Sequence, residues 1–349
     1  KGDLLVETRR LLFYYDPNSY FVVRVSAFID ILTFSAYSAT SVIFAVFSFG
    51  GLWALYMCFS SQFVNYQSPL SLAILFLPSV VFWGSGILKD TLTIGALGWM
   101  IYAFHKIIFK GQRKLSLFLI FISCFYIILI VKKYILICLI PAILLWIFAK
   151  YSSKIHSMAL KVAVVPLLFV IVIAFCYLAV DIIVKEDTRY SFENLAETTR
   201  ITAYDIGFYT GRNAGSGYNL GELDGTFQSM IRLFPAAVNV ALFRPYLWEV
   251  KNPLMLISAL ESFVVFFLTL YITLKVGLFR LFKYAFNPFV FFCLVFSITF
   301  AFAVGVSTFN FGTLVRYKIP LMPFYLSAIV IIYYQWKRDK KLEVLALTE

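Results

Sequence analysis

The sequence has few charged residues, and this scarcity excludes most soluble folds. Of its 349 residues, 14% are Asp, Glu, Lys or Arg, whereas 62% are hydrophobic. A soluble domain of this length needs a charged surface over all of its elements, but here the charges gather in short clusters between apolar runs. The composition therefore predicts an all-α polytopic integral membrane protein.

Histidine and cysteine are too sparse or too scattered for the usual metal and disulfide chemistry. The two histidines, His105 and His156, both fall on the side of the membrane predicted below to be cytoplasmic. All five cysteines lie inside apolar runs, without the paired spacing of a zinc site. We therefore expect neither disulfides nor zinc, and no histidine base on the outer face.

Long polar stretches are rare too, and one dominates, from Asp181 to Asn252. Its glycine-rich run, residues 211–225, is either a flexible loop or a backbone that approaches an anionic or sugar ligand closely. Apolar residues then recur at helical spacing over 228–243, which predicts a helix lying on a membrane surface.

The apolar runs give the expected architecture. A membrane span needs about 20 helical residues, and nine runs qualify if the short ones borrow from their flanks: 38–59, 70–83, 91–109, 115–131, 134–148, 158–184, 253–274, 289–306 and 319–336. Residues 20–34 are interrupted by Arg24 and Asp30, so we expect an interfacial helix there. We also expect a further helix before Lys1.

Four parts follow from this pattern. They are an acidic outer segment with an interfacial helix (1–37), a transmembrane module (38–184), an extracytoplasmic loop with an interfacial helix (185–252), and C-terminal transmembrane helices with a basic tail (253–349).

Positive charge indicates the orientation. The net charge is +12, and basic clusters at 110–114, 150–161, 275–283 and 337–341 share one side if the runs alternate. That side is predicted to be the cytoplasm, where such charges meet lipid headgroups, so the excess is no sign of nucleic-acid binding.

Cations on the outer face break this rule. Lys132 and Lys133 lie there, as do Arg316 and Lys318. They either hold the phosphate or pyrophosphate of a lipid substrate or extend to lipid headgroups, and both interpretations stay open.

The order of elements resembles the GT-C superfamily of glycosyltransferases, which includes protein O-mannosyltransferases and lipid A aminoarabinose transferases. An acidic segment (GDLLVE) and an aromatic interfacial helix (DPNSYFVV) are followed by a span ending in FLPSVVFWGSG and by Lys89-Asp90 opening the next span. RYKIPLMPF at 316–324 is similar to a motif that opens a late helix in the same enzymes. The whole chain also resembles EpsG-like and Wzy-like polysaccharide polymerases of bacteria.

The resemblance implies roles for residues. Asp3 is the position that matches the catalytic base, and Asp16 is the second choice; the longer acidic segment of the family is absent here. Asp90 would help to bind an acceptor or a metal, but an Asp at a helix start also caps free N–H groups. Lys89 either pairs with Asp90 or points at the lipid phosphate. Whether a divalent cation takes part stays open.

Glu261 is the one acid well inside an apolar run. A carboxylate there should be neutral and hydrogen-bonded to a neighbouring helix, or should face a hydrated cavity with a cation as its partner. For the second case Arg244 and Arg316 are the expected cations.

The predicted function is that of a membrane glycosyltransferase. It would move a sugar or glycan from a polyprenyl phosphate or pyrophosphate carrier to a glycan, lipid or protein acceptor, in a bacterial inner membrane with the active face outside the cytoplasm. One alternative is a polysaccharide polymerase. The other is a non-enzymatic transporter or flippase of lipid-linked glycans, although the two halves show no repeat and no ATP-binding signature appears.

Overall fold

The structure is a computed structural model that describes residues 14, 16–152, 166, 167, 170, 174, 178, 194–211 and 216–348. Within these residues every regular element is a helix, and the sole β pairing is an isolated antiparallel bridge between Gly217 and Asn310. The chain divides into two compact units. Unit 1 comprises the described residues of Lys1–Gln62 and Val80–Leu136, and unit 2 comprises those of Phe63–Ser79 and Ile137–Glu349.

Unit 1 is built around two spanning helices whose backbones touch. Its helices are α2 (Pro17–Thr33), α3 (Tyr37–Ser60), α6 (Lys89–Phe104), which continues into the π-turn η2 (His105–Phe109), and α7 (Leu115–Val131). Glycines allow α3 and α6 to approach, because a Cβ on Gly98 would lie 1.9 Å from the carbonyl oxygen of Gly51. This contact fixes where α6 begins relative to α3.

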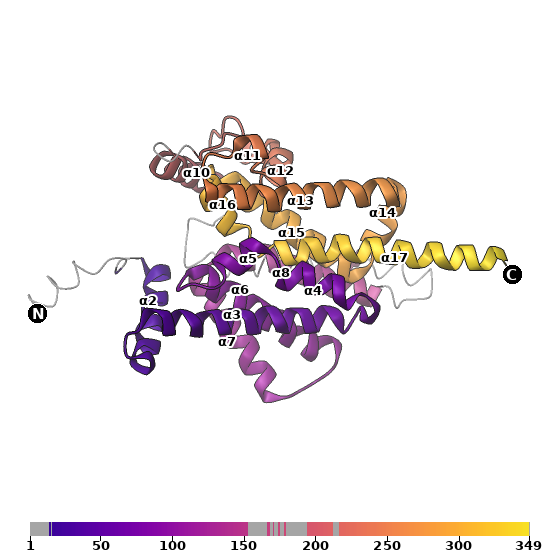
Figure 1. Cartoon of the computed structure of the whole chain (residues 1–349), viewed down its shortest axis with the longest axis horizontal. Helices are drawn as coiled ribbons and strands as arrows, with labels where there is room; N and C mark the ends of the chain where they lie inside the picture. The colour runs from indigo at the N-terminus through magenta and orange to yellow at the C-terminus, as the bar shows by residue number, and fades with distance from the viewer. Residues whose placement is uncertain are drawn as a thin grey trace, which may run out of the picture. The chain divides into compact units, whose positions relative to one another are not determined.

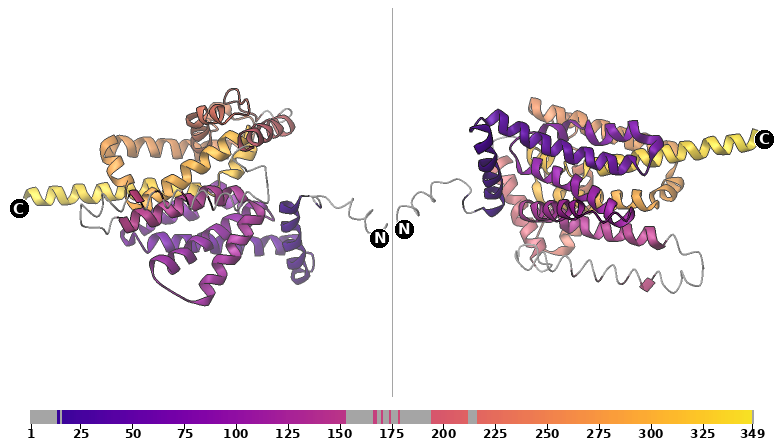
Figure 2. Two further views of the ribbon diagram at one scale, coloured as in Figure 1. Left: turned by 180° about the vertical axis from the view of Figure 1, so that it is seen from behind. Right: turned by 90° about the horizontal axis from the view of Figure 1, so that it is seen from below.

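Helix α2 runs across α3, as two views show (Figures 1 and 2). Asp16 caps its start by accepting a hydrogen bond from the Asn18 N–H at 3.1 Å. Its far end is tied to α3 by Asp30, which accepts from the Thr40 hydroxyl at 2.5 Å. Phe28 and Ile31 are largely exposed on it. Helix α2 thus lies crosswise and has exposed apolar side chains, and its place at a membrane interface stays a prediction.

Unit 2 holds most of the remaining helices around an aromatic core. They are α4 (Gln67–Leu75), most of α8 (Lys133–Ser152), α10 (Leu195–Gly211), α11 (Phe227–Arg232), α12 (Phe234–Phe243), η4 (Leu247–Glu249), α13 (Pro253–Val276), α14 (Leu278–Ala285), α15 (Pro288–Thr308), α16 (Phe311–Tyr317) and α17 (Met322–Thr348). In the core, Trp146 stacks on Phe292 with ring centroids 4.6 Å apart, and Phe324 packs edge-on against Phe296 at 4.8 Å. Such packing fixes α8, α15 and α17 against one another.

Five described helices are long and apolar enough to cross a membrane: Tyr37–Ser60, Lys89–Phe109, Lys133–Ser152, Pro253–Val276 and Pro288–Thr308. They coincide with five of the nine expected runs. Most of the expected run 319–336 lies in α17, which begins at Met322 and forms a bent pair with α16 at 67°. The run 115–131 is the shorter helix α7. For the described residues, an all-helical architecture with membrane-type helices is thereby confirmed.

Two expected runs have other outcomes. The run 70–83 is interrupted at Phe76 and Leu77, where α4 ends and the six-residue helix α5 (Pro78–Trp83) begins. Pro78 has no N–H to donate to the preceding turn, which explains a break at this place. The run 158–184 lies mostly outside the described residues.

The helix expected on a membrane surface over 228–243 is two helices, α11 and α12, separated at Leu233. Ala237 and Val240 of α12 are fully buried against α15, and a Cβ on Gly305 would lie 2.1 Å from the Ala237 carbonyl oxygen. The apolar face of α12 therefore packs on α15, and a position of this segment at a membrane surface stays a prediction.

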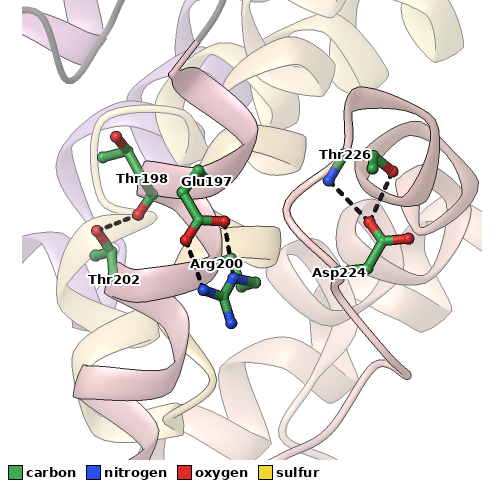
Figure 3. Close-up of polar contacts among 6 residues, drawn as sticks. All are labelled: Glu197, Thr198, Arg200, Thr202, Asp224 and Thr226. Atoms are coloured by element: carbon green, nitrogen blue, oxygen red, sulfur yellow. Dashed lines mark hydrogen bonds and ion pairs between the residues drawn. The ribbon is translucent and has the colours of Figure 1, made fainter.

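The described end of the glycine-rich run is ordered by neighbouring side chains (Figure 3). Gly225 has a φ of +86°, and a Cβ there would lie 2.2 Å from a carboxylate oxygen of Glu197, which itself accepts from Arg200 at 2.9 Å. Asp224 accepts from the Thr226 N–H at 2.8 Å. Hydrogen bonds from Ser229 and Thr226 lower the pKa of Asp224 to about 2. The positive φ favours glycine at position 225, and a Cβ there would also have to displace the flexible Glu197 side chain.

Candidate functional site

In unit 1 the candidate site forms at the start of α6. The chain turns before it, and the Thr91 hydroxyl donates to the Gly86 carbonyl at 2.6 Å. Leu88 is extended, so the helix begins at Lys89 and places Asp90 in its first turn. A carboxylate at this position faces the free N–H groups and the positive end of the helix dipole.

Asp90 forms a direct ion pair with Lys132. The Lys132 ammonium lies 2.5 Å from Asp90 Oδ1, and the two residues are 5% and 3% exposed. Lys132 is the C-cap of α7, where a cation is favoured by the negative end of the helix dipole. Both charges therefore sit at the helix ends that stabilise them, which offsets part of the cost of burying an ion pair.

A second, more exposed pair lies next to the first. Lys89 Nζ is 3.2 Å from Asp16 Oδ2, and the two side chains are 31% and 45% exposed. Burial alone would raise the pKa of Asp16, but hydrogen bonds from Ser19 and Lys89 and the charge of Lys89 lower this pKa overall. Asp16 is thus ionised at neutral pH and is a weaker base than an isolated aspartate.

We call Asp16, Lys89, Asp90 and Lys132 the entry cluster. It consists of two ion pairs that start from the adjacent residues Lys89 and Asp90 and join the ends of three helices, although its residues are up to 116 positions apart in the sequence. All four were named from the sequence as candidates, and their meeting agrees with the expectation that these segments share one face. Chemically, the cluster offers two carboxylates and two ammonium groups, of which the Asp16–Lys89 pair is open to a ligand.

In unit 2 the sequence-predicted acid Glu261 lies on α13 and caps a neighbouring helix. Ser79, the second residue of α5, donates to it twice, from its N–H to Oε2 and from its hydroxyl to Oε1, both at 2.7 Å. Glu261 is 7% exposed. The hydrogen-bond donors to Glu261 thus come from a neighbouring helix, which was the first of the two alternatives for this residue. Neither Arg244 nor Arg316 donates these two hydrogen bonds, so the expectation of an arginine partner is wrong for them.

The buried cation beside Glu261 is Lys318. Its ammonium donates to the Ser262 hydroxyl at 3.0 Å and to the Arg244 carbonyl at 3.4 Å, and the residue is fully buried. The Ser262 hydroxyl donates in turn to the same carbonyl at 3.0 Å. Lys318 also attracts the Glu261 carboxylate electrostatically. We call Ser79, Glu261, Ser262 and Lys318 the α13 cluster.

Arg244 itself points to a different acid. Its Nε donates to Glu249 Oε2 at 3.1 Å, and its terminal nitrogen binds the other oxygen, so the pair is bidentate. Aromatic rings surround the guanidinium: those of Phe311, Tyr246 and Tyr218 have centroids 5.2, 5.6 and 5.8 Å away. Arg244 therefore pairs with Glu249 on one side and makes cation–π contacts with the three rings on its other sides.

The polar loop and the segment before α16 meet beside Arg244. The Tyr218 N–H donates to the Phe309 carbonyl at 3.1 Å, and the Phe311 N–H donates to the Ser216 carbonyl at 2.9 Å. The Tyr218 hydroxyl bonds Thr308 Oγ1 at 2.7 Å. This pairing agrees with the expectation that the two segments share one face, and it shows that residues 216–218 are held by backbone bonds.

The other predicted residues have simpler outcomes. Asp3 lies outside the described residues. Lys133 opens α8 and is half-buried, in contrast to the buried Lys132. Arg316 lies on α16 and is half-buried.

Among the described residues, no three His, Cys, Asp or Glu side chains gather in a group that could hold a metal ion.

Sequence reasoning missed three partners of the predicted residues: two serines and one acid. Ser79 and Ser262 complete the α13 cluster, and Glu249 holds Arg244. A signal for Ser79 was present, since a Pro-Ser pair after an apolar stretch is typical of a helix start. Ser262 stands next to Glu261, and two polar neighbours inside an apolar run also indicate a buried polar contact.

Comparisons with protein-family models, with curated proteins and with solved structures returned no match.

Proposed function

We propose that the chain is a membrane glycosyltransferase that moves a sugar or glycan from a polyprenyl phosphate or pyrophosphate carrier to an acceptor outside the cytoplasm. The observation that carries this proposal is the entry cluster, in which two acids and two cations from α2, α6 and α7 meet at one end of unit 1. Transfer from a lipid phosphate needs both types of charge. The cation stabilises the departing phosphate oxygens, and the acid orients or deprotonates the acceptor hydroxyl.

The two pairs of the cluster have different parts in this proposal. Lys89 and Asp16 are exposed enough for a substrate to reach them. Asp90 and Lys132 are buried, so their role is to hold the start of α6, and with it the adjacent Lys89, in place. When a lipid phosphate binds Lys89, it competes with Asp16 for the ammonium. Without the Lys89 ammonium beside it, the Asp16 carboxylate has a higher pKa and is a stronger base when the acceptor arrives.

Binding and transfer can be tested separately. The full chain in lipid nanodiscs is titrated with undecaprenyl phosphate. The same preparation is assayed, with glycan, lipid and peptide acceptors present, for release of this lipid from a panel of undecaprenyl-phosphate-linked sugars. We expect Lys89→Gln to weaken binding about tenfold, and Asp16→Asn to retain binding while losing transfer.

The matched control is Asp339→Asn, which removes the acid of another exposed ion pair, Arg338–Asp339 on α17. It should leave both binding and transfer unchanged. If Lys89→Gln and Asp339→Asn bind the lipid as tightly as the wild type, the entry cluster is not the phosphate site and the proposal fails.

A second candidate is a transporter of lipid-linked glycans, and broken helices favour it. The run 70–83 breaks into α4 and α5, with the Glu261 carboxylate at the start of α5, and α16 meets α17 at 67°. Discontinuous helices with charged groups at their ends are typical of transporters. A transporter leaves its substrate intact, so the appearance of free undecaprenyl phosphate in the transfer assay separates the two functions. A polymerase would also release the lipid carrier, but its acceptor would be a second lipid-linked glycan.

A further inference from the structure

Helix α14 is a short connecting helix between two candidate spans, α13 and α15 (Figure 1). The chain leaves α13 at Gly277, which has a φ of +80° and open space where a Cβ would be, so it can turn sharply there. After α14, Asn287 caps the start of α15 by accepting from the Phe289 N–H at 3.1 Å. Since both neighbours are membrane-type helices, α14 must lie near the end of the bilayer that both of them reach.

The side chains of α14 divide into three faces. Tyr284 is buried and donates its hydroxyl hydrogen to Asp339 of α17 at 3.0 Å, which holds that face against the protein. Phe279, Phe282 and Phe286, at spacings of three and four residues, share a face directed away from it and are 91%, 55% and 70% exposed. Large aromatic side chains with this exposure need a partner other than water.

Cations flank the phenylalanine face. Arg280 and Lys283 follow the exposed phenylalanines around the helix, and Lys275 stands one turn before it at the end of α13; all three are exposed. Two acids of α17 act on Tyr284: Asp339, which is already bound by Tyr284 and by Arg338 at 3.1 Å, and Glu343, which acts through its charge alone. The charged side chains on α14 itself, Arg280 and Lys283, are both positive.

We propose that α14 is a membrane-surface helix that binds anionic phospholipid. Its phenylalanines insert among the acyl chains of one leaflet, and Lys275, Arg280 and Lys283 bind the phosphate groups of negatively charged lipids there. An apolar face bordered by Lys and Arg suits a bilayer, which offers hydrocarbon and negative charge at adjacent depths. The basic residues of this connection were also predicted to face the cytoplasm, where anionic lipids attract them. This inference is independent of the proposed function.

Insertion is tested by accessibility. The full chain with Phe279→Cys is placed in nanodiscs of phosphatidylcholine and phosphatidylglycerol and treated with a water-soluble, membrane-impermeant maleimide. Arg113→Cys, in the loop before α7, serves as the exposed control, and the unsubstituted chain gives the background of the native cysteines. We expect Phe279→Cys to react at least about tenfold more slowly than Arg113→Cys. Equal rates would overturn the proposal.

Headgroup selectivity is tested by lipid retention. Native mass spectrometry of the chain released from the same mixed nanodiscs gives the ratio of bound phosphatidylglycerol to phosphatidylcholine. Arg280→Gln with Lys283→Gln should lower this ratio about tenfold. The control, Lys110→Gln with Arg113→Gln, removes the same charge from another basic cluster and should change it much less.

Two further results would overturn the assignment. An equal loss in both double variants would mean that the whole basic surface attracts the lipid and that α14 has no special part. Protection of Phe279→Cys together with an unchanged lipid ratio in the α14 variant would mean that the helix inserts without binding anionic headgroups.

Discussion

The two units keep buried charges out of water in different ways. In unit 1 the opposite charges touch, with the Lys132 ammonium 2.5 Å from Asp90. In unit 2 neutral groups bind each charge first: Ser79 donates twice to Glu261, and Lys318 donates to Ser262 and to the Arg244 carbonyl. The buried ions of unit 1 therefore depend on each other, whereas the buried Glu261 and Lys318 of unit 2 depend mainly on serines and on backbone. Unit 2 also has a direct ion pair, Arg244–Glu249, but its two side chains are partly exposed.

This difference has an energetic consequence. When one member of a directly paired, buried couple is removed, the other is left as an uncompensated charge. When a charge is bound by hydroxyl and amide groups, a neutral polar side chain of the same shape keeps many of its hydrogen bonds. We therefore expect strong coupling between Asp90 and Lys132 and weak coupling between Glu261 and Lys318.

The largest effect is expected for Asp90→Leu, which removes the carboxylate that pairs with the buried Lys132. The loss of unfolding free energy should be about 3–5 kcal/mol, measured by denaturant titration of the full chain in mixed micelles. The double variant Asp90→Leu/Lys132→Met removes both charges and should recover most of that loss. A double variant as unstable as the sum of the single ones would show that the pair is not coupled.

Close packing of helix backbones should give the next effect, and here the two units should behave alike. An alanine at Gly98 of unit 1 or at Gly305 of unit 2 would place its Cβ 1.9 or 2.1 Å from a backbone oxygen of the facing helix. The helices must move apart, at a cost of about 2–3 kcal/mol for each variant.

Gly50→Ala is the matched control for these two variants. Its nearest neighbour would be the Trp99 side chain at 3.3 Å, which can move slightly, so a loss below about 1 kcal/mol is expected. Thermal unfolding in detergent measures all three. If Gly98→Ala is as stable as Gly50→Ala, α3 and α6 are not in backbone contact.

A smaller effect is expected in the α13 cluster. Glu261→Gln can still accept from the Ser79 N–H, and in Lys318→Met the Ser262 hydroxyl can still donate to the Arg244 carbonyl. Each substitution should cost about 1–2 kcal/mol. In a double-mutant cycle their coupling energy should be below about 1 kcal/mol, clearly smaller than that of Asp90 with Lys132. Equal coupling in the two units would refute the comparison.

The smallest effect concerns the pH dependence of the exposed pair. The folded-state pKa of Asp16 is lowered from its ordinary value of 3.8, although burial opposes this. The stabilisation is therefore complete above pH values near 4 and is lost as the pH falls through the lower, folded-state pKa. Since both side chains are partly exposed, it should be below about 1 kcal/mol. Asp16→Asn should lack this acid-dependent loss, and unfolding at pH 3 and pH 6 measures the difference.

Much of the helical layout could be predicted from the sequence. The expected run 38–59 is α3, Tyr37–Ser60, and the run 253–274 is α13, Pro253–Val276. Long apolar runs have few other stable structures in a membrane, because every backbone group must be bonded internally. Composition and run length were therefore sufficient for the helical class and for these bounds.

The residues of the entry cluster could also be named in advance, but their pairing could not. Lys89 was considered a partner of Asp90, its neighbour, yet Lys89 binds Asp16, and Asp90 binds Lys132, 42 positions away. Likewise, Glu261 binds Ser79, 182 positions away, and not an arginine. Neighbours in sequence at a helix start point in different directions, so each finds its own partner.

The sequence alone determined that the described chain is helical, the positions of its five long apolar helices and the few charges that are buried. Only the tertiary structure decided which charges meet, where α12 packs and that α5 is separate from α4. The physical reason is that these helices are apolar on nearly all sides. Such a pattern specifies the length of each helix but not its rotation about its own axis. Close packing at residues such as Gly98 and Gly305 sets that rotation, and the rotation selects the partner of every buried polar side chain.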